Sequence, residues 1–355
     1  MLNLGKSLRR LYIDRLELLP SVLTDPRTII FRASPIERAQ VSLHHVMHGL
    51  LPPEARAASF GKPKIVMRRS QDETLLPNED FCDRFIQICK DYTRRTSQRW
   101  DHSTDMDYLN SRLRKYMPNQ TRIAVKSKPS IHNLHDIINA TEATGRSDIA
   151  LPKEFYETKV RQIIERIAYE EEYAAFHESN EMRQVGIGGL LGDVVERMVT
   201  KAQSPNGTPS GPKLFLAGGH DSTLAGIMAS MGAVDANATG KWPPYASIVA
   251  VELFKDPSRD TRSETSKAIG RTQSKDLSAK QRQSLETHYV RIKYNDKSLV
   301  VPGCGEPGRN WKGDSSFCTL VSFIQDQIGE DTNANRLPSK KLLISSHPEI
   351  GSKAV

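Results

Sequence analysis

The sequence predicts an α/β fold, because two segments far apart in the chain share the order strand, turn, helix. In the second of them, the apolar run 214–216 is followed by a Gly-Gly turn and then by apolar residues at helical spacing over 224–231. In the first, residues 27–32 predict a strand, and a helix starts close to Pro35. The intervening chain has helical periodicity, so we expect a helical block between two strand-and-helix units.

Length and composition allow a sizeable buried core. The chain has 355 residues, of which 37% are hydrophobic and 26% are charged. No apolar run approaches the ~20 residues that a membrane helix needs, and residues 1–12 lack the apolar stretch of a secretory signal. We therefore expect an intracellular protein, cytoplasmic or mitochondrial, whose first residues form a core helix through Leu4, Leu8 and Leu11.

Half of the formal charge of +8 lies in one stretch. Residues 255–284 carry eight basic and four acidic side chains, are rich in Ser and Thr, and contain few large apolar residues. That composition predicts a disordered insert with solvated charges. A nucleic-acid surface would need basic and aromatic side chains interleaved on a folded face, so we expect no nucleic-acid partner. Residues 328–355 are predicted to form a loose tail.

The four cysteines show neither a C-x-x-C pair nor a histidine at zinc-ligand spacing, so the sequence predicts no metal site. Cys82 and Cys89 are predicted to be buried thiols. Cys304 and Cys318 flank a glycine-rich loop and could form a disulfide, but in an intracellular protein we expect them to be reduced.

The main candidate for chemistry is the pair His220 and Asp221, which lies on the predicted turn between strand and helix. In open α/β sheets, ligands bind at the carboxyl ends of strands, beside helix N-termini that attract anions. An imidazole and a carboxyl group in that place can serve acid–base chemistry. The alternative is structural, with Asp221 capping the helix and His220 packed against its neighbours.

Arg32 occupies the equivalent position at the end of the first predicted strand. A guanidinium group buried at a strand end needs an anion or a carboxylate as its partner. Arg32 is therefore either a binding residue for an anionic ligand or one half of a structural ion pair.

Five other histidines are candidates by residue type alone. His44, His45 and His48 fall on the polar side of a predicted helix, where solvated surface histidines are expected. The spacing of His44 and His48 matches that of a zinc-binding helix, but His45 replaces the general-base Glu of that motif. His132 and His135 belong to the helical block and are expected on a polar helix face.

Several motifs, in this order, resemble the histidine acid phosphatases, the second branch of the histidine phosphatase superfamily. The resemblance runs from about Leu4 to about Phe323, interrupted by residues 255–284. It is carried by Phe31-Arg-Ala-Ser followed by Glu37-Arg38, Gly219-His-Asp-Ser-Thr-Leu, Lys241-Trp-Pro-Pro-Tyr-Ala-Ser, Val251-Glu-Leu-Phe and Tyr289-Val-Arg-Ile-Lys-Tyr-Asn. The strings most similar to the lysophosphatidic-acid phosphatase subgroup are Leu75-Leu-Pro-Asn, Lys241-Trp-Pro-Pro and Val301-Pro-Gly-Cys.

The resemblance implies a phosphoglycerate-mutase-like fold, in which helices flank a mixed sheet and a helical cap is inserted. The implied core covers residues 1–63 and 202–327, and the implied cap covers residues 64–201. The resemblance also implies hydrolysis of a small phosphomonoester, such as lysophosphatidic acid, through a phosphohistidine and without a cofactor. In that mechanism Arg32 binds phosphate oxygens, His220 hydrogen-bonds the transferring phosphoryl group, and Asp221 protonates the leaving alcohol.

One part of the family pattern is absent from this sequence. The nucleophilic histidine of these enzymes lies in an Arg-His-Gly-x-Arg-x-Pro string on the first strand, and residues 1–355 contain no such string. The resemblance therefore implies an N-terminally incomplete chain without the first catalytic strand, inactive as it stands. The alternative is a non-catalytic, anion-binding pseudophosphatase that keeps Arg32 as its anion site.

Overall fold

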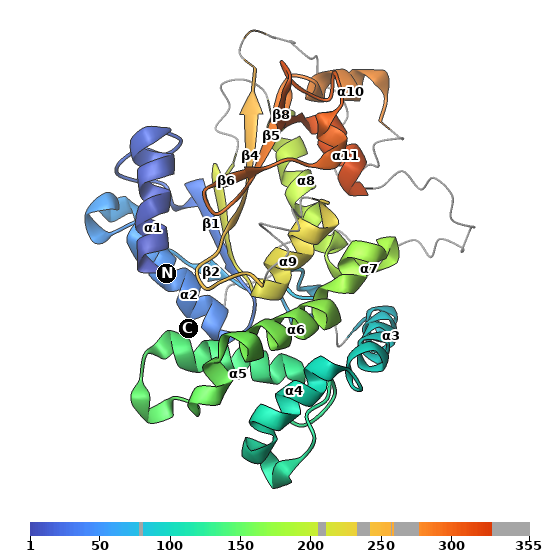
Figure 1. Ribbon diagram of the computed structural model, residues 1–355. Helices are drawn as coiled ribbons and strands as arrows, with labels where there is room; N and C mark the ends of the chain where they lie inside the picture. Colours follow the sequence, from blue (N-terminus) through green and yellow to red (C-terminus); the bar gives the residue numbers. More distant parts are fainter. Residues whose placement is uncertain (78–80, 205–210, 233–241, 257, 259–276, 329–355) are drawn as a thin grey trace.

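The computed structural model describes residues 1–77, 81–204, 211–232, 242–256, 258 and 277–328 (Figure 1). Its described strands form two separate ladders. The first is parallel, with the order β2-β1-β3, and contains β1 (Ile29–Ala33), β2 (Ile65–Val66) and β3 (Leu214–Gly218). The second is antiparallel and contains β4 (Val249–Lys255), β5 (His288–Tyr294), β6 (Lys297–Leu299), β7 (Asn310–Trp311) and β8 (Asp314–Thr319). In it the order is β4-β5-β8-β7, and β6 pairs with β5.

The helices fall into three groups along the chain. Before the cap come α1 (Leu2–Arg9), continued by a π-helix over Arg10–Arg15, and α2 (Glu37–Leu50). The middle of the chain forms α3 (Asp83–Trp100), α4 (Thr104–Leu113), α5 (Ile131–Thr144), α6 (Thr158–Glu178), α7 (Asn180–Gly186) and α8 (Gly188–Ala202). The last part forms α9 (Asp221–Ser230), α10 (Ala279–Leu285) and α11 (Leu320–Ile328).

The parallel ladder brings the two predicted strand ends together. Arg32 of β1 lies opposite Ala217 of β3, and Ala33 lies opposite Gly218. One residue further on, the Ser34 N–H donates to the carbonyl oxygen of Gly218 at 3.1 Å. The chain therefore leaves both strands at the same edge of the sheet, which is where ligands bind in open parallel sheets.

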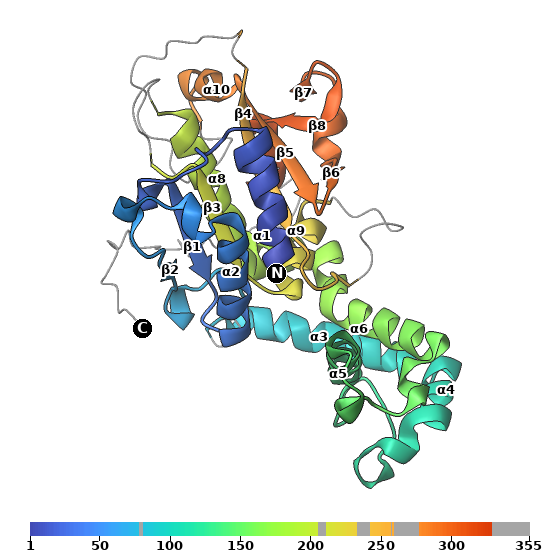
Figure 2. The ribbon, with the colours of Figure 1, turned by 90° about the vertical axis from the view of Figure 1, so that its left-hand side faces the viewer.

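Helices α1 and α2 cover one face of the parallel ladder, as Figure 2 shows. They cross at two glycines. A Cβ added to Gly5 would lie 2.2 Å from the carbonyl oxygen of Val46, and one added to Gly49 would lie 2.3 Å from that of Leu2. Both distances are far below van der Waals contact, so the crossing requires glycine at both positions.

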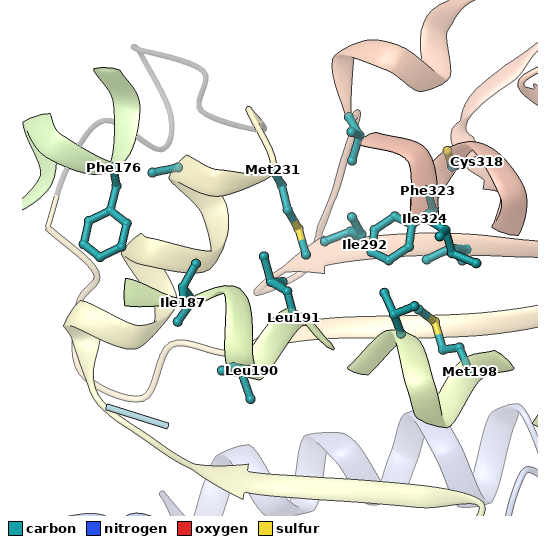
Figure 3. Close-up of a cluster of buried hydrophobic side chains, with 14 of the residues drawn as sticks. Phe176, Ile187, Leu190, Leu191, Met198, Met231, Ile292, Cys318, Phe323 and Ile324 are labelled. Atoms are coloured by element: carbon teal, nitrogen blue, oxygen red, sulfur yellow. The ribbon is translucent and has the colours of Figure 1, made fainter. Parts of the chain in front are cut away.

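A second, larger core lies under the antiparallel ladder. There Leu191 of α8 and Met231 after α9 pack with Ile292 of β5 and with Phe323 and Ile324 of α11 (Figure 3). All five side chains are buried. Burial of apolar surface on this scale is the main stabilising contribution in a folded domain, and here it joins α8, α9 and α11 to β5.

Helices α3 to α6 extend away from the sheets (Figure 2), and they enclose an apolar cluster of their own. This helical projection confirms the α/β fold with a helical cap. The parallel and antiparallel strands that the resemblance implied are both present, but they form two ladders instead of one continuous mixed sheet. Among the described helices, none combines the length and the apolar character that crossing a bilayer requires.

The predicted insert at 255–284 needs a correction at both ends. Lys255 belongs to β4, and α10 begins at Ala279 after a Ser278–Gln281 capping box. Leu277 is buried, as is Leu285 at the end of the helix, which explains why the segment packs despite its polar composition. Residues 257 and 259–276, and most of the predicted tail, lie outside the described residues.

The cysteines also differ from expectation. Cys304 and Cys318 are joined by a disulfide, with their Cα atoms 5.1 Å apart. The prediction that both are reduced was wrong. It rested on the reducing environment expected inside a cell and took no account of the distance between the two cysteines. β8 brings Cys318 alongside the turn that holds Cys304, and the chain fold decides the pairing. Cys82 and Cys89 are not part of a disulfide, and both are half-buried.

Candidate active site

A cavity of about 1370 Å³ opens where β3 ends, between the sheets and the cap. Its walls come from the β3–α9 turn, the first turns of α2, the cap helices α5 and α6, and the segment 242–249. Leu4 and Leu8 of α1 add an apolar wall. A cavity of this size can hold a small-molecule ligand.

His220 is held in place by two hydroxyl groups. Its backbone N–H donates to Thr223 Oγ1 at 3.2 Å, which caps the start of α9. Its ring Nε2 lies 2.8 Å from Ser34 Oγ, so the end of β1 is bonded to the end of β3. The residue is 8% exposed and lines the cavity. Burial lowers the pKa of His220, and the nearby Arg38 cation lowers it further.

Asp221 is the first residue of α9 and is exposed to the cavity. Its Oδ1 accepts from the Ser222 N–H at 3.0 Å, and its Oδ2 accepts from the Trp242 indole N–H at 2.6 Å. These two donors orient the carboxyl group. Each oxygen keeps a further lone pair that can accept a hydrogen bond from a substrate or take up a proton.

Trp242 connects this carboxyl group to the cap. Its ring centroid lies 4.3 Å from that of His135 on α5 and 5.0 Å from that of Tyr173 on α6. The same ring packs against both the core cluster and the cap cluster. Trp242 therefore ties the orientation of Asp221 to the position of the cap.

Arg32 is buried, with 5% exposure, and it does not line the cavity. Its guanidinium group forms ion pairs with Glu73 and with Asp193, the latter at 3.3 Å, and donates to Thr74 Oγ1 at 2.9 Å. Burial lowers the pKa of Arg32, and the two carboxylates oppose that shift. These contacts are those of a structural ion pair, yet Arg32 Nε has no partner in the described structure.

Two residues of the site were quoted in motifs without a role. Arg38 lies in the first turn of α2, six residues after Arg32, and lines the cavity as an exposed cation. Its short distance in sequence from the end of β1 was the feature that could have predicted this position. Glu73, which pairs with Arg32 and also lines the cavity, had no signal in the sequence. Trp242 was visible only as part of its motif.

The charges around the cavity are mostly negative. Among the described lining residues the arginine and lysine side chains are Arg38 and Arg161, whereas the carboxylates are Glu73, Asp136, Glu142, Glu165, Glu172 and Asp221. A dianionic ligand therefore needs close contact with specific donors, because carboxylates outnumber cationic side chains on these walls.

The five other candidate histidines divide into two sets. His44, His45 and His48 are exposed on α2, as predicted, and the described residues contain no cluster of three potential metal ligands. Both His132 and His135 line the cavity. His132 is half-buried and its ring nitrogens lie 3.7 Å from Asp136 and 3.6 Å from Glu172, which agrees with the predicted polar face. For His135 that prediction was wrong, because its side chain is buried. His135 is buried against Trp242, and burial lowers its pKa to about 4. That contact comes from a residue far away in the sequence.

Comparisons with known proteins agree on one family. A family model described as "Histidine phosphatase superfamily (branch 2)" matches residues 1–295. A probable acid phosphatase of Schizosaccharomyces pombe is 32% identical over 337 residues, which cover 90% of this chain and 70% of that protein. Lysophosphatidic acid phosphatase type 6 of Homo sapiens is 25% identical over 256 residues, covering 72% of this chain and 55% of that protein. This chain thus spans between 55% and 70% of these two relatives.

A solved structure shows the same fold. The apo form of Hafnia alvei phytase superposes with a TM-score of 0.58 over 92% of this chain and 84% of that one, at 13% sequence identity. At that identity the likeness concerns the arrangement of the elements alone.

Proposed function

The chain belongs to the histidine phosphatase superfamily, branch 2, and we propose that its cavity binds the phosphate group of a small phosphomonoester. One observation carries the proposal. His220 and Asp221, at the start of α9, face a single cavity and are fixed there by Ser34 and Trp242 from two other segments. An oriented imidazole and carboxyl group beside a helix N-terminus suit the binding and protonation of a phosphate ester.

The roles we propose follow the family pattern. His220 donates a hydrogen bond to a phosphoryl oxygen, and Asp221 protonates the leaving alcohol. Arg32 and Arg38 supply positive charge, Arg38 directly from the cavity wall and Arg32 from beneath it. Phosphoryl transfer depends chiefly on positioning and charge neutralisation, so these residues suit binding even where no nucleophile is present.

We propose lysophosphatidic acid, or a phosphomonoester like it, as the substrate class. The name of the human relative supports this, and so does the apolar wall that Leu4 and Leu8 contribute to the cavity. An acyl chain could bury its methylene groups there, and each buried CH₂ contributes about 0.8 kcal/mol.

We further propose that the 355-residue chain binds phosphate without hydrolysing phosphomonoesters. The sequence contains no Arg-His-Gly-x-Arg-x-Pro string. In the cap, His132 and His135 pack against Trp242, and His220, with Nε2 bonded to Ser34, is assigned to binding the phosphoryl group and not to attacking it. Loss of the nucleophile in enzymes that act through one removes orders of magnitude in rate.

Calorimetric titration of the purified chain with orthophosphate tests binding. We expect saturable binding that His220→Ala weakens at least tenfold and that His44→Ala, an exposed matched control on α2, leaves unchanged. Turnover of an aryl phosphate and of lysophosphatidic acid at acidic pH should stay at background. The proposal of binding fails if phosphate does not bind, and the proposal of inactivity fails if turnover is robust and survives His220→Ala.

A further inference from the structure

Glu73 is held as a bound anion would be held. Its Oε1 accepts from the Thr74 N–H at 2.8 Å and the Leu75 N–H at 2.6 Å, and it also accepts from Nη2 of Arg32. Two successive backbone N–H groups and a guanidinium group converging on one oxygen form a typical anion-binding arrangement. Glu73 is 5% exposed, so little water competes for these donors.

The fit between Glu73 and its surroundings is incomplete. Glu73 Oε2 and Arg32 Nε are both buried, and neither has a hydrogen-bond partner among the described residues. Each unsatisfied buried group is unfavourable, and more so when it belongs to a charged side chain. Glu73 Oε1 accepts from Nη2 of Arg32 and not from Nε. A phosphate group can accept from two N–H groups of a guanidinium group in parallel.

The donors around Glu73 are anchored independently of its side chain. Thr74 Oγ1 donates to Asp193 Oδ2 at 2.8 Å, and Thr223 Oγ1 donates to the carbonyl oxygen of Leu75 at 2.5 Å. Because these bonds fix the backbone of residues 74 and 75, the Glu73 side chain can rotate away without moving the N–H groups. Glu73 lines the cavity that contains His220 and Asp221, so the position that it vacates opens into that cavity.

We propose that Glu73 is an internal competitor for phosphate, occupying the anion position formed by Arg32 and the N–H groups of Thr74 and Leu75. The inference rests on the proposed phosphate-binding function. A tetrahedral phosphate group displaces the Glu73 carboxylate, accepts hydrogen bonds from the same donors and reaches the free Nε of Arg32. Glu73 thereby sets the affinity of the site and discriminates against weak monoanions, which offer no more acceptors than the carboxylate does.

Titration with orthophosphate can test this in the full 355-residue chain. Glu73→Ala removes the competitor, and Glu73→Gln removes its charge while keeping an acceptor oxygen. The matched control is Glu165→Gln, which makes the same charge change at another lining residue, on α6. We expect phosphate to bind at least tenfold more tightly to Glu73→Ala, severalfold more tightly to Glu73→Gln, and less than twofold more tightly to Glu165→Gln.

The outcomes separate the inference from the function on which it rests. If wild type binds phosphate in a His220-dependent manner and neither Glu73 variant binds it more tightly, the function stands and the inference is overturned. Equal gains in Glu73→Gln and Glu165→Gln also overturn it, because they reveal a general charge effect. If neither wild type nor the Glu73 variants bind phosphate, both fail. Thermal melting shows that each variant is folded, and Glu73→Gln keeps the test decisive if Glu73→Ala unfolds.

Discussion

The ends of β1 and β3 lie next to each other at one edge of the parallel ladder, yet they differ in what their polar residues can reach. At the end of β3, Asp221 faces the cavity and its neighbour His220 lines it. At the end of β1, Arg32 is covered by Glu73 and does not reach the cavity wall. Equivalent positions in the topology therefore carry different chemistry, because the loop that follows β2 closes one strand end and leaves the other open.

Removing the cation from the closed end should have the largest effect. Arg32→Met leaves the buried Glu73 carboxylate without its cation, whereas Asp193 keeps Arg68 at 2.8 Å. Breaking a buried pair in this way costs about 3 to 5 kcal/mol. Urea denaturation measures the loss. Arg27→Met, which breaks a solvent-exposed pair with Asp25, is the control and should change the urea midpoint little. A loss no greater than that of the control would mean that the β1 end is hydrated.

The pH dependence of stability should show how well the buried histidines are shielded from water. Burial lowers the pKa of His220, and it lowers those of His135 and His288 to about 4. A lowered pKa means that the unfolded chain takes up protons first as the pH falls below about 6.5. Stability is therefore complete above that pH and declines toward pH 4, by an amount on the order of 3 kcal/mol for His135.

Melting temperatures recorded from pH 8 to pH 4 test this decline. We expect His135→Gln to flatten the slope between pH 6.5 and 4, whereas His48→Gln on the exposed side of α2 should leave it unchanged. Identical slopes in wild type and His135→Gln would show that His135 is hydrated.

Removing the hydrogen bond that orients Asp221 should cause the smallest loss of stability. Trp242→Phe keeps an aromatic ring against His135 and Tyr173 but removes the N–H that bonds Asp221 Oδ2. Because Asp221 is exposed, the loss should be about 0.5 to 1 kcal/mol in urea denaturation. Trp242→Phe in an Asp221→Ala background should then cost nothing more. A full cost in that background would show that the ring, and not its N–H group, makes the difference.

The predictability of the site depended on how far apart its partners lie in the sequence. The apolar run 214–216 and the Gly-Gly pair identified β3 and the turn that carries His220, because periodicity and turn chemistry are local. The same reasoning placed Arg32 at the end of β1 and left its partner open between a ligand and a carboxylate. The structure shows the carboxylates, and the family assignment keeps the ligand as a proposal.

Contacts between distant parts of the chain could not be predicted from the sequence, for a physical reason. The Arg32–Glu73 pair and the Trp242–Asp221 bond join residues 41 and 21 positions apart, and no periodic pattern encodes such distances. The Cys304–Cys318 disulfide was missed because compartment was used in place of geometry. Residues 277–284 were placed in a disordered stretch because one buried leucine, Leu277, and one capping box were averaged into a polar window.

The size of the cavity depends on two glycines at the crossing of α1 and α2. Gly5 and Gly49 let the helix backbones touch, and this contact fixes where Leu4 and Leu8 stand at the apolar wall. Any larger residue at either glycine pushes α1 outward and carries that wall with it. If the proposed phosphomonoester binds here, the room for its alcohol part can change through substitutions at this helix crossing, without any change to His220, Asp221 or Arg32.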